Sequence, residues 1–114
     1  MHELSIAQSI LSIAEKSVPA GEKVVITGVS LKIGELSSIE IDSLQFAFSV
    51  IKENTLLESA ELDIEIIPGE AECLDCHAIF VIHAYGACCP KCRGYAIKIA
   101  KGRELKIADI TVEE

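Results

Sequence analysis

The chain has 114 residues, of which half are hydrophobic and 4% are aromatic, with no tryptophan. This composition excludes disorder as the dominant state and predicts one small domain, or a domain with a satellite module, around an aliphatic core. Ten basic residues stand against 18 acidic ones, and the net charge of -8 argues against a nucleic-acid partner, because phosphate backbones would be repelled. The longest uninterrupted apolar run covers only residues 78–82, so we expect neither a signal peptide nor a membrane-spanning segment.

Hydrophobic periodicity predicts six regular elements. In chain order they are a helix over 3–17, a strand over 23–33, a helix from Asp42 to Asn54, and strands over 61–67, 95–100 and 105–112. Asp42 followed by Gln45 resembles a capping box, so Asp42 is the expected N-cap. The side chains expected to face the core are Leu4, Ala7, Ile10, Leu11, Ala14, Val25, Val29, Leu31, Ile33, Leu44, Ala47, Phe48, Ile51, Leu62, Ile64 and Ile66.

Charge and cysteine content change abruptly along the chain. Residues 71–103 contain five basic and two acidic side chains, whereas the other residues contain five basic and 16 acidic ones. All five cysteines fall in the basic segment. Together with Pro68-Gly69, a dipeptide that favours a turn, this break predicts a boundary near residue 69.

Two CxxC pairs carry the strongest chemical signal in the sequence. Cys73 and Cys76 form one pair, Cys89 and Cys92 form the other, and 12 residues separate them. Two such knuckles joined by a hairpin make a tetrahedral four-sulfur site, for which we expect structural Zn(II), with iron in a rubredoxin-type site as the alternative. Cys88 is interpreted as a partly buried thiol, with a redox or metal-relay role as the alternative. The odd cysteine count disfavours a disulfide framework and favours the cytoplasm.

These observations predict an α+β fold, in which two helices lie on a small three-stranded sheet and a zinc-ribbon-like module is inserted. The expected domains are an α/β domain of residues 1–70 plus 104–114 and a four-cysteine zinc module of residues 71–103. A core this small is often marginal without a staple such as a metal.

The first three residues can form a chelate if Met1 is a free amino terminus. The α-amino group, the amide nitrogen of His2 and its imidazole close two fused rings, which suit Ni(II) or Cu(II). Glu3 can complete the site by its carboxylate or by its amide. The alternative is an incidental histidine, with Glu3 serving the positive end of the first helix.

Several of these motifs, read together, resemble the HypA/HybF family of hydrogenase nickel-incorporation metallochaperones. The resemblance covers essentially the whole chain and is carried by Met-His-Glu-Leu-Ser at the start, Gly34-Glu35-Leu36, the two cysteine pairs and the tail from Gly102 to Ile107. It implies a nickel site at Met1, His2 and Glu3 and a structural zinc at Cys73, Cys76, Cys89 and Cys92. It also implies delivery of Ni(II) to the hydrogenase large-subunit precursor together with a HypB-type GTPase, and in some organisms service to urease.

Other function classes have less support. An enzyme is not expected, because no Ser/His/Asp grouping or phosphate loop stands out and a four-thiolate metal is closed to substrate. A zinc-ribbon adaptor has only the basic segment in its favour, and an iron-loaded, rubredoxin-like electron carrier would be coloured. His77 and His83 are expected to be surface residues, with nickel ligation as the alternative.

Overall fold

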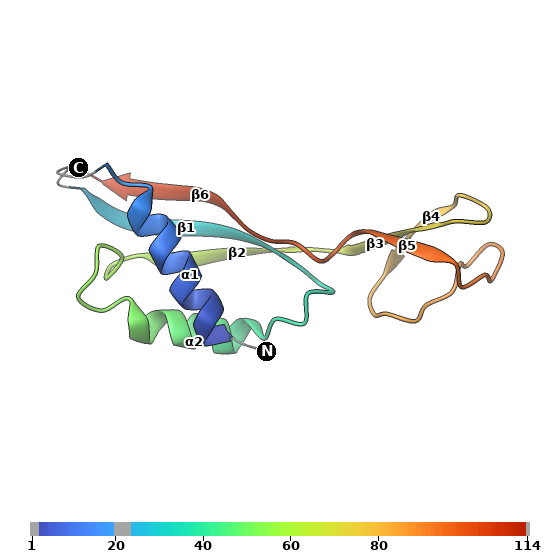
Figure 1. Cartoon of the computed structure of the whole chain (residues 1–114), viewed down its shortest axis with the longest axis horizontal. Helices are drawn as coiled ribbons and strands as arrows, with labels where there is room; N and C mark the ends of the chain where they lie inside the picture. Colours follow the sequence, from blue (N-terminus) through green and yellow to red (C-terminus); the bar gives the residue numbers. More distant parts are fainter. Residues whose placement is uncertain (1–2, 20–23, 114) are drawn as a thin grey trace. The chain divides into compact units, whose positions relative to one another are not determined.

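The computed structural model describes residues 3–19 and 24–113, which form two helices and two three-stranded sheets (Figure 1). The elements are α1 (Glu3–Lys16), β1 (Val25–Gly34), α2 (Ile41–Ile51), β2 (Glu61–Ile67), β3 (Gly69–Cys73), β4 (Ile79–Ile82), β5 (Ile97–Lys101) and β6 (Leu105–Glu113). The predicted α+β class, with two helices, a three-stranded sheet and a separate cysteine-bearing part, is confirmed. No described helix has the length and hydropathy needed to cross a bilayer.

The chain forms two compact units. The helical unit consists of Met1–Leu31, Ile39–Ile64 and Ile107–Glu114, and the cysteine unit consists of Lys32–Ser38 and Glu65–Lys106. The cysteine unit is larger than the expected zinc module of residues 71–103, because it extends over residues 65–106 and includes the turn that follows β1. The expected division into an α/β domain of residues 1–70 plus 104–114 and a zinc module of residues 71–103 stays a prediction.

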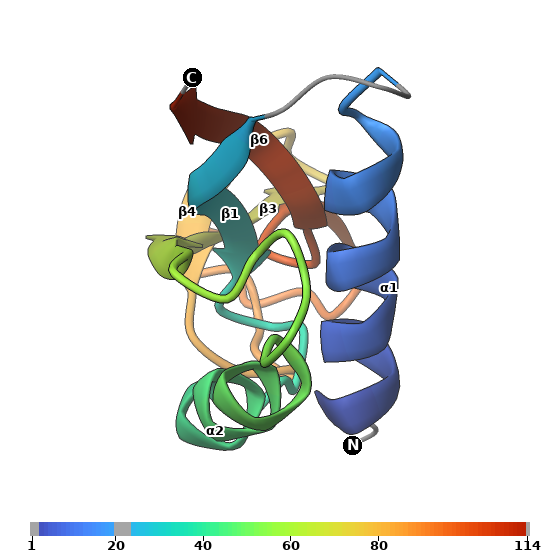
Figure 2. The same cartoon turned by 90° about the vertical axis from the view of Figure 1, so that its left-hand side faces the viewer.

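Amphipathic helices build the core of the helical unit. α1 and α2 pack against each other, and Figure 2 shows α2 nearly end-on beside α1. The larger sheet has the strand order β2-β1-β6, so β1 is central. The buried residues of the helical unit are Ala7, Ile10, Ala14, Val24, Ile26, Val29, Leu31, Leu44, Phe48, Leu57 and Ala60.

Three side chains that were expected to face the core are exposed. Leu4 is 53% exposed, Val25 is 49% exposed and Ile66 is 47% exposed, so these predictions are wrong. In β1 the buried positions change phase between Ile26 and Val29. The periodicity shows which apolar side chains share a face of an element, but not how far neighbouring elements cover that face.

The amino terminus of α2 is capped differently from the expectation. The N-cap is Glu40, with no capping bond from its own side chain, and Asp42 lies inside the first turn, so the Asp42 prediction is wrong. The Glu3 carboxylate, from the first residue of α1, instead accepts a hydrogen bond from the Glu40 N–H at 3.1 Å. The carboxylates of Glu3 and Asp42 both suit the positive amino-terminal end of α2. α2 ends at Ile51, three residues before the predicted stop at Asn54.

The cysteine unit is built on an antiparallel sheet of order β4-β3-β5. Leu36, Ala71 and Ile82 form its buried apolar cluster, against which Phe80 and Ile99 pack. Strands β3 and β4 are absent from the predicted elements. The predicted turn at residues 68–69 is wrong, because a single residue separates β2 from β3 and the chain continues as strand.

The turn after β1 is bonded into the cysteine unit. The N–H of Glu35 donates to the carbonyl of Ile67 at 2.8 Å, and the N–H of Leu36 donates to the carbonyl of Gly102 at 2.6 Å. The Glu35 carboxylate accepts from the N–H of Gly69 at 2.9 Å. These bonds explain why this turn and the cysteine-bearing strands belong to one compact unit.

Candidate metal centre

The first cysteine pair occupies the tight turn that ends β3. Cys73 is its last strand residue, and the N–H of Cys76 donates to the Cys73 sulfur at 3.5 Å. The N–H of His77 donates to the carbonyl of Cys73 at 2.9 Å, and His77 has a positive φ of 63°. The chain therefore folds back at once, and both sulfurs lie on the inside of the turn.

The second pair repeats this geometry. The N–H groups of Lys91 and Cys92 donate to the Cys89 sulfur at 3.4 and 3.5 Å. The N–H of Arg93 donates to the carbonyl of Cys89 at 2.8 Å, and Arg93 has a φ of 60°. A β-carbon on Gly94 would lie 3.0 Å from a carboxylate oxygen of Asp75 and 3.3 Å from the Cys92 sulfur, so a larger residue would crowd both groups.

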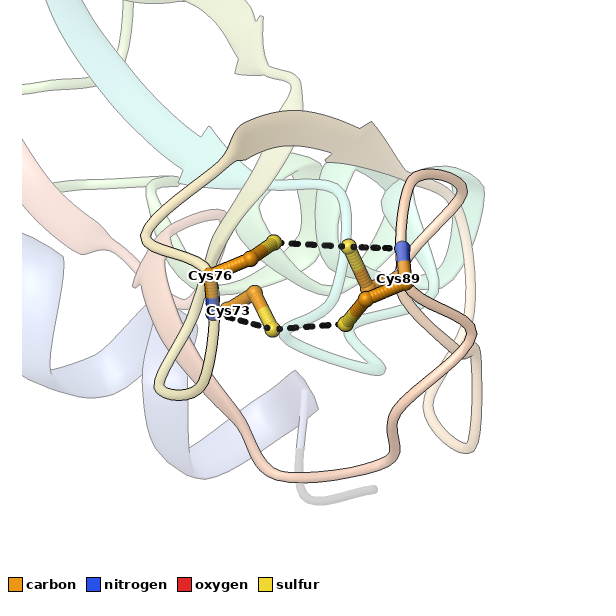
Figure 3. Close-up of side chains that lie close together, drawn as sticks. Cys73, Cys76 and Cys89 are labelled. Atoms are coloured by element: carbon orange, nitrogen blue, oxygen red, sulfur yellow. Dashed lines mark hydrogen bonds between the residues drawn. The ribbon is translucent and has the colours of Figure 1, made fainter.

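The four sulfurs of the two turns converge on one point (Figure 3). The sulfurs of Cys73 and Cys92 lie 3.5 Å apart, as do those of Cys76 and Cys89. All four sulfurs lie within 4.8 Å of one another. A tetrahedron with Zn–S bonds of about 2.3 Å has sulfurs about 3.8 Å apart. The spacing is that of a four-thiolate metal site.

Neighbouring sulfurs and N–H groups shift the acidities of the thiols in opposite directions. The N–H of Cys92, assisted by that of Lys91, lowers the pKa of Cys89 to about 6. The N–H of Gly94 favours the thiolate of Cys92, but the neighbouring sulfurs and burial outweigh it and raise the pKa of Cys92 to about 12. The pKa of Cys76 is also raised, because its neighbouring sulfurs and burial outweigh the N–H of Ala78. Four thiolates this close repel one another, and a divalent cation removes that repulsion, so the donor set fits Zn(II).

The structure brings together the four predicted zinc ligands and leaves Cys88 out. In the described part of the chain, these four cysteines form the only group of three or more acidic, histidine or cysteine side chains with metal-ligand spacing. Cys73 and Cys89 are buried, Cys76 and Cys92 are exposed, and Cys88 is partly exposed outside the group. Service of these four thiols as zinc ligands stays a prediction.

The predicted nickel residues are only partly described. Met1 and His2 lie outside the described residues, so the expected chelate stays a prediction. Glu3 opens α1, and its carboxylate bonds the Glu40 N–H.

The two other histidines lie on the surface of the cysteine unit. Both side chains are 75% exposed, and neither belongs to the sulfur cluster. His77 lies 3.5 Å from the Glu72 carboxylate, and His83 bonds the Glu35 carboxylate at 2.8 Å. The hydrogen bond from the N–H of Gly69 and, to a smaller extent, the hydrogen bond with His83 lower the pKa of Glu35. Glu35 lies in one of the motifs that carry the family resemblance, but its partners are 34 and 48 residues away, so the motif alone did not indicate this role.

Fold and site together define a small α+β protein with a four-cysteine cluster typical of a structural zinc site. Comparison with known proteins identifies the family to which this chain belongs. The profile of the family described as "Hydrogenase/urease nickel incorporation, metallochaperone, hypA" matches residues 1–112. The chain therefore belongs to the HypA family of nickel-incorporation metallochaperones for hydrogenase maturation.

Individual relatives agree over nearly the full length. The hydrogenase maturation factor HypA of Geobacter metallireducens is 42% identical over 99% of this chain and 100% of its own. That of Methanocaldococcus jannaschii is 36% identical over 99% and 98%. The solution structure of the Ni metallochaperone HypA from Helicobacter pylori superposes with a TM-score of 0.67 at 29% identity, covering 96% of both chains.

Proposed function

We propose that the chain binds Ni(II) through Met1, His2 and Glu3 at a free amino terminus and delivers it to the [NiFe]-hydrogenase large-subunit precursor. The family match over residues 1–112 carries the proposal, because it includes the terminal Met-His-Glu sequence. Nickel is cargo in this function. An exposed terminal chelate can load the ion and surrender it, whereas a buried cage would retain it.

The bonding of Glu3 supports one of the two ways in which it can complete the nickel site. Its carboxylate is engaged with the Glu40 N–H at the start of α2. This favours ligation by the Glu3 amide nitrogen over ligation by the carboxylate. The carboxylate then holds the start of α1 against α2.

We further propose that Cys73, Cys76, Cys89 and Cys92 hold one structural Zn(II). Such a site stabilises the small cysteine unit and leaves no open coordination position, so the metal would be structural and closed to substrate. Iron in the same four sulfurs, for a rubredoxin-like carrier, is the second candidate that this donor set admits. We propose a cytoplasmic location, where the four zinc-ligand cysteines and Cys88 stay reduced. The second partner in this proposal is a HypB-type GTPase.

The test is a calorimetric titration of Ni(II) into the tag-free, zinc-loaded chain. We expect one nickel per chain, no stoichiometric binding in His2→Ala, and weaker binding when one residue is added before Met1. The affinity for Ni(II) should decrease as the pH is lowered, because the ligands must lose protons to bind the ion. Unchanged nickel affinity in His2→Ala would contradict the proposed site, and a red, iron-loaded protein would contradict the structural zinc.

A further inference from the structure

An apolar groove lies between the first turn of α1 and the outer side of α2. Its volume is about 600 Å³, and it is lined by Glu3, Leu4, Ser5, Ser43, Phe46, Ala47 and Val50. α1 and α2 pack against each other: the amino-terminal end of α1 crosses α2 in Figure 1 and lies beside it in Figure 2. The groove belongs wholly to the helical unit.

The large apolar side chains of this groove are unusually exposed. Phe46 is 71% exposed, Val50 is 55% exposed and Leu4 is 53% exposed. Phe46 and Val50 are four residues apart, so they share one face of α2, whereas Leu44 and Phe48 are buried. Single exposed apolar residues are common, but three that line one groove mark a surface for another molecule.

The surroundings of the groove are acidic. The helical unit contains twelve acidic and three basic residues, a net charge of -9, and the cysteine unit contains six and seven, a net charge of +1, which together give the -8 of the chain. Glu3 stands in the groove wall, and Glu40 and Asp42 lie at the start of α2. This end of the groove therefore favours a positively charged occupant.

The basic residues nearest in sequence, Lys52 at the C-cap of α2 and Lys16 in α1, lie away from the groove. The Lys52 ammonium group donates to the carbonyl of Ala60 at 2.9 Å and lies 5.8 Å from the centre of the buried Phe48 ring. It therefore faces the inner side of α2. Lys16 is at the opposite end of α1 from Leu4, about 18 Å away along the helix.

We propose that this groove docks an amphipathic helix of the protein that receives the nickel, with apolar side chains on one face and lysine or arginine at its flanks. The inference rests on the proposed function, in which the recipient is the hydrogenase large-subunit precursor. Transfer requires the ligands of the recipient to reach an ion held by the first three residues. Glu3 belongs both to that proposed nickel site and to the groove wall, so a segment bound in the groove brings the recipient to the donor site. Apolar anchors inside and basic residues at the rim match the apolar walls and the acidic end.

The test measures binding of the purified large-subunit precursor to the zinc-loaded, full-length chain. We expect Phe46→Ser and Val50→Ser to raise Kd by about tenfold or more, since anchors of this kind carry most of the binding energy. Ile13→Ser is the matched control, because Ile13 lies on α1 outside the groove and is 55% exposed, as Val50 is. Ile13→Ser should leave Kd unchanged. A photo-crosslinking residue in place of Val50 should capture a precursor segment that carries lysine or arginine.

Several results would overturn the docking proposal. One is an unchanged Kd for the precursor in both groove variants, and another is an equal loss of precursor binding in Ile13→Ser. The proposal also fails if the groove variants lose only binding to the HypB-type GTPase, or if the chain self-associates and Phe46→Ser relieves this association. Nickel titration of the same variants separates this outcome from failure of the proposed function. Phe46→Ser should bind Ni(II) as the unmodified chain does. If the nickel-site proposal is wrong, His2→Ala will bind Ni(II) as tightly as the unmodified chain.

Discussion

The end of β1 lies close against the turn before β6, and this close backbone approach at Gly34 predicts a large effect of one methyl group. A β-carbon at Gly34 would lie 2.0 Å from the carbonyl oxygen of Gly102 and 2.5 Å from the nitrogen of Arg103. Both neighbours are backbone atoms, so neither can rotate away. Gly34→Ala must therefore displace the chain at Gly102 and Arg103.

The displacement acts on two hydrogen bonds. The N–H of Gly34 donates to the carbonyl of Glu104 at 2.8 Å, and the N–H of Leu36 donates to the carbonyl of Gly102 at 2.6 Å. Overpacking costs about 1–3 kcal/mol, and each weakened bond costs about 0.5–1.5 kcal/mol. We expect Gly34→Ala to lower the free energy of unfolding by about 2–6 kcal/mol, a large share of the total for a small domain.

Gly28→Ala, in the same strand, is the matched control. The nearest atoms to its β-carbon would be those of Thr111 at 3.7 Å, an ordinary contact, so the change should be less than about 1 kcal/mol. Urea unfolding of the zinc-loaded chain, followed by far-ultraviolet circular dichroism, measures both variants. Equal effects of Gly34→Ala and Gly28→Ala would refute the reasoning from backbone contact.

Three further predictions concern the cysteine unit. Cys89→Ala should lose zinc while Cys88→Ala keeps it, as metal analysis will show, and the reverse result would overturn the ligand assignment. Gly94→Ala should weaken zinc binding about tenfold in a chelator competition, because its methyl group crowds the Cys92 sulfur and such neighbouring groups tune affinity. The lowered pKa of Glu35 means that its contribution to stability is complete above its ordinary value of 4.5 and is lost as pH falls through the lowered pKa. Unfolding curves of the unmodified chain and Glu35→Ala should therefore differ at pH 7 and converge in acid, and a pH-independent difference would contradict this.

Local sequence determined the features that depend on neighbouring residues. Spacing within each CxxC pair was enough to predict two knuckles, because a turn of four residues places both sulfurs by backbone geometry alone. Helical spacing likewise predicted α1 and α2, since an apolar stripe defines the element that carries it. The family resemblance, which combined both ends of the chain, predicted membership that the comparisons confirm.

Tertiary structure alone decided which apolar faces are covered. Leu4 and Phe46 are apolar residues in amphipathic helices, as Ala7 and Phe48 are, yet the first two are exposed and the other two are buried. Burial depends on which elements pack above each face, and those elements come from distant parts of the chain. Periodicity therefore located the helices but did not reveal the groove between them.

The hydrogen bonds between distant segments were also beyond local reasoning. Asp42 had the expected capping sequence, but the carboxylate of Glu3 bonds the start of α2 from 37 residues away. Glu35 similarly joins Gly69 and His83, which approach it only after the chain has folded. Local spacing therefore predicted both helices and the chemistry of the cysteine pairs. Strands β3 and β4 and these hydrogen-bond partners emerged only from the fold, because contacts between distant residues depend on the path of the whole chain.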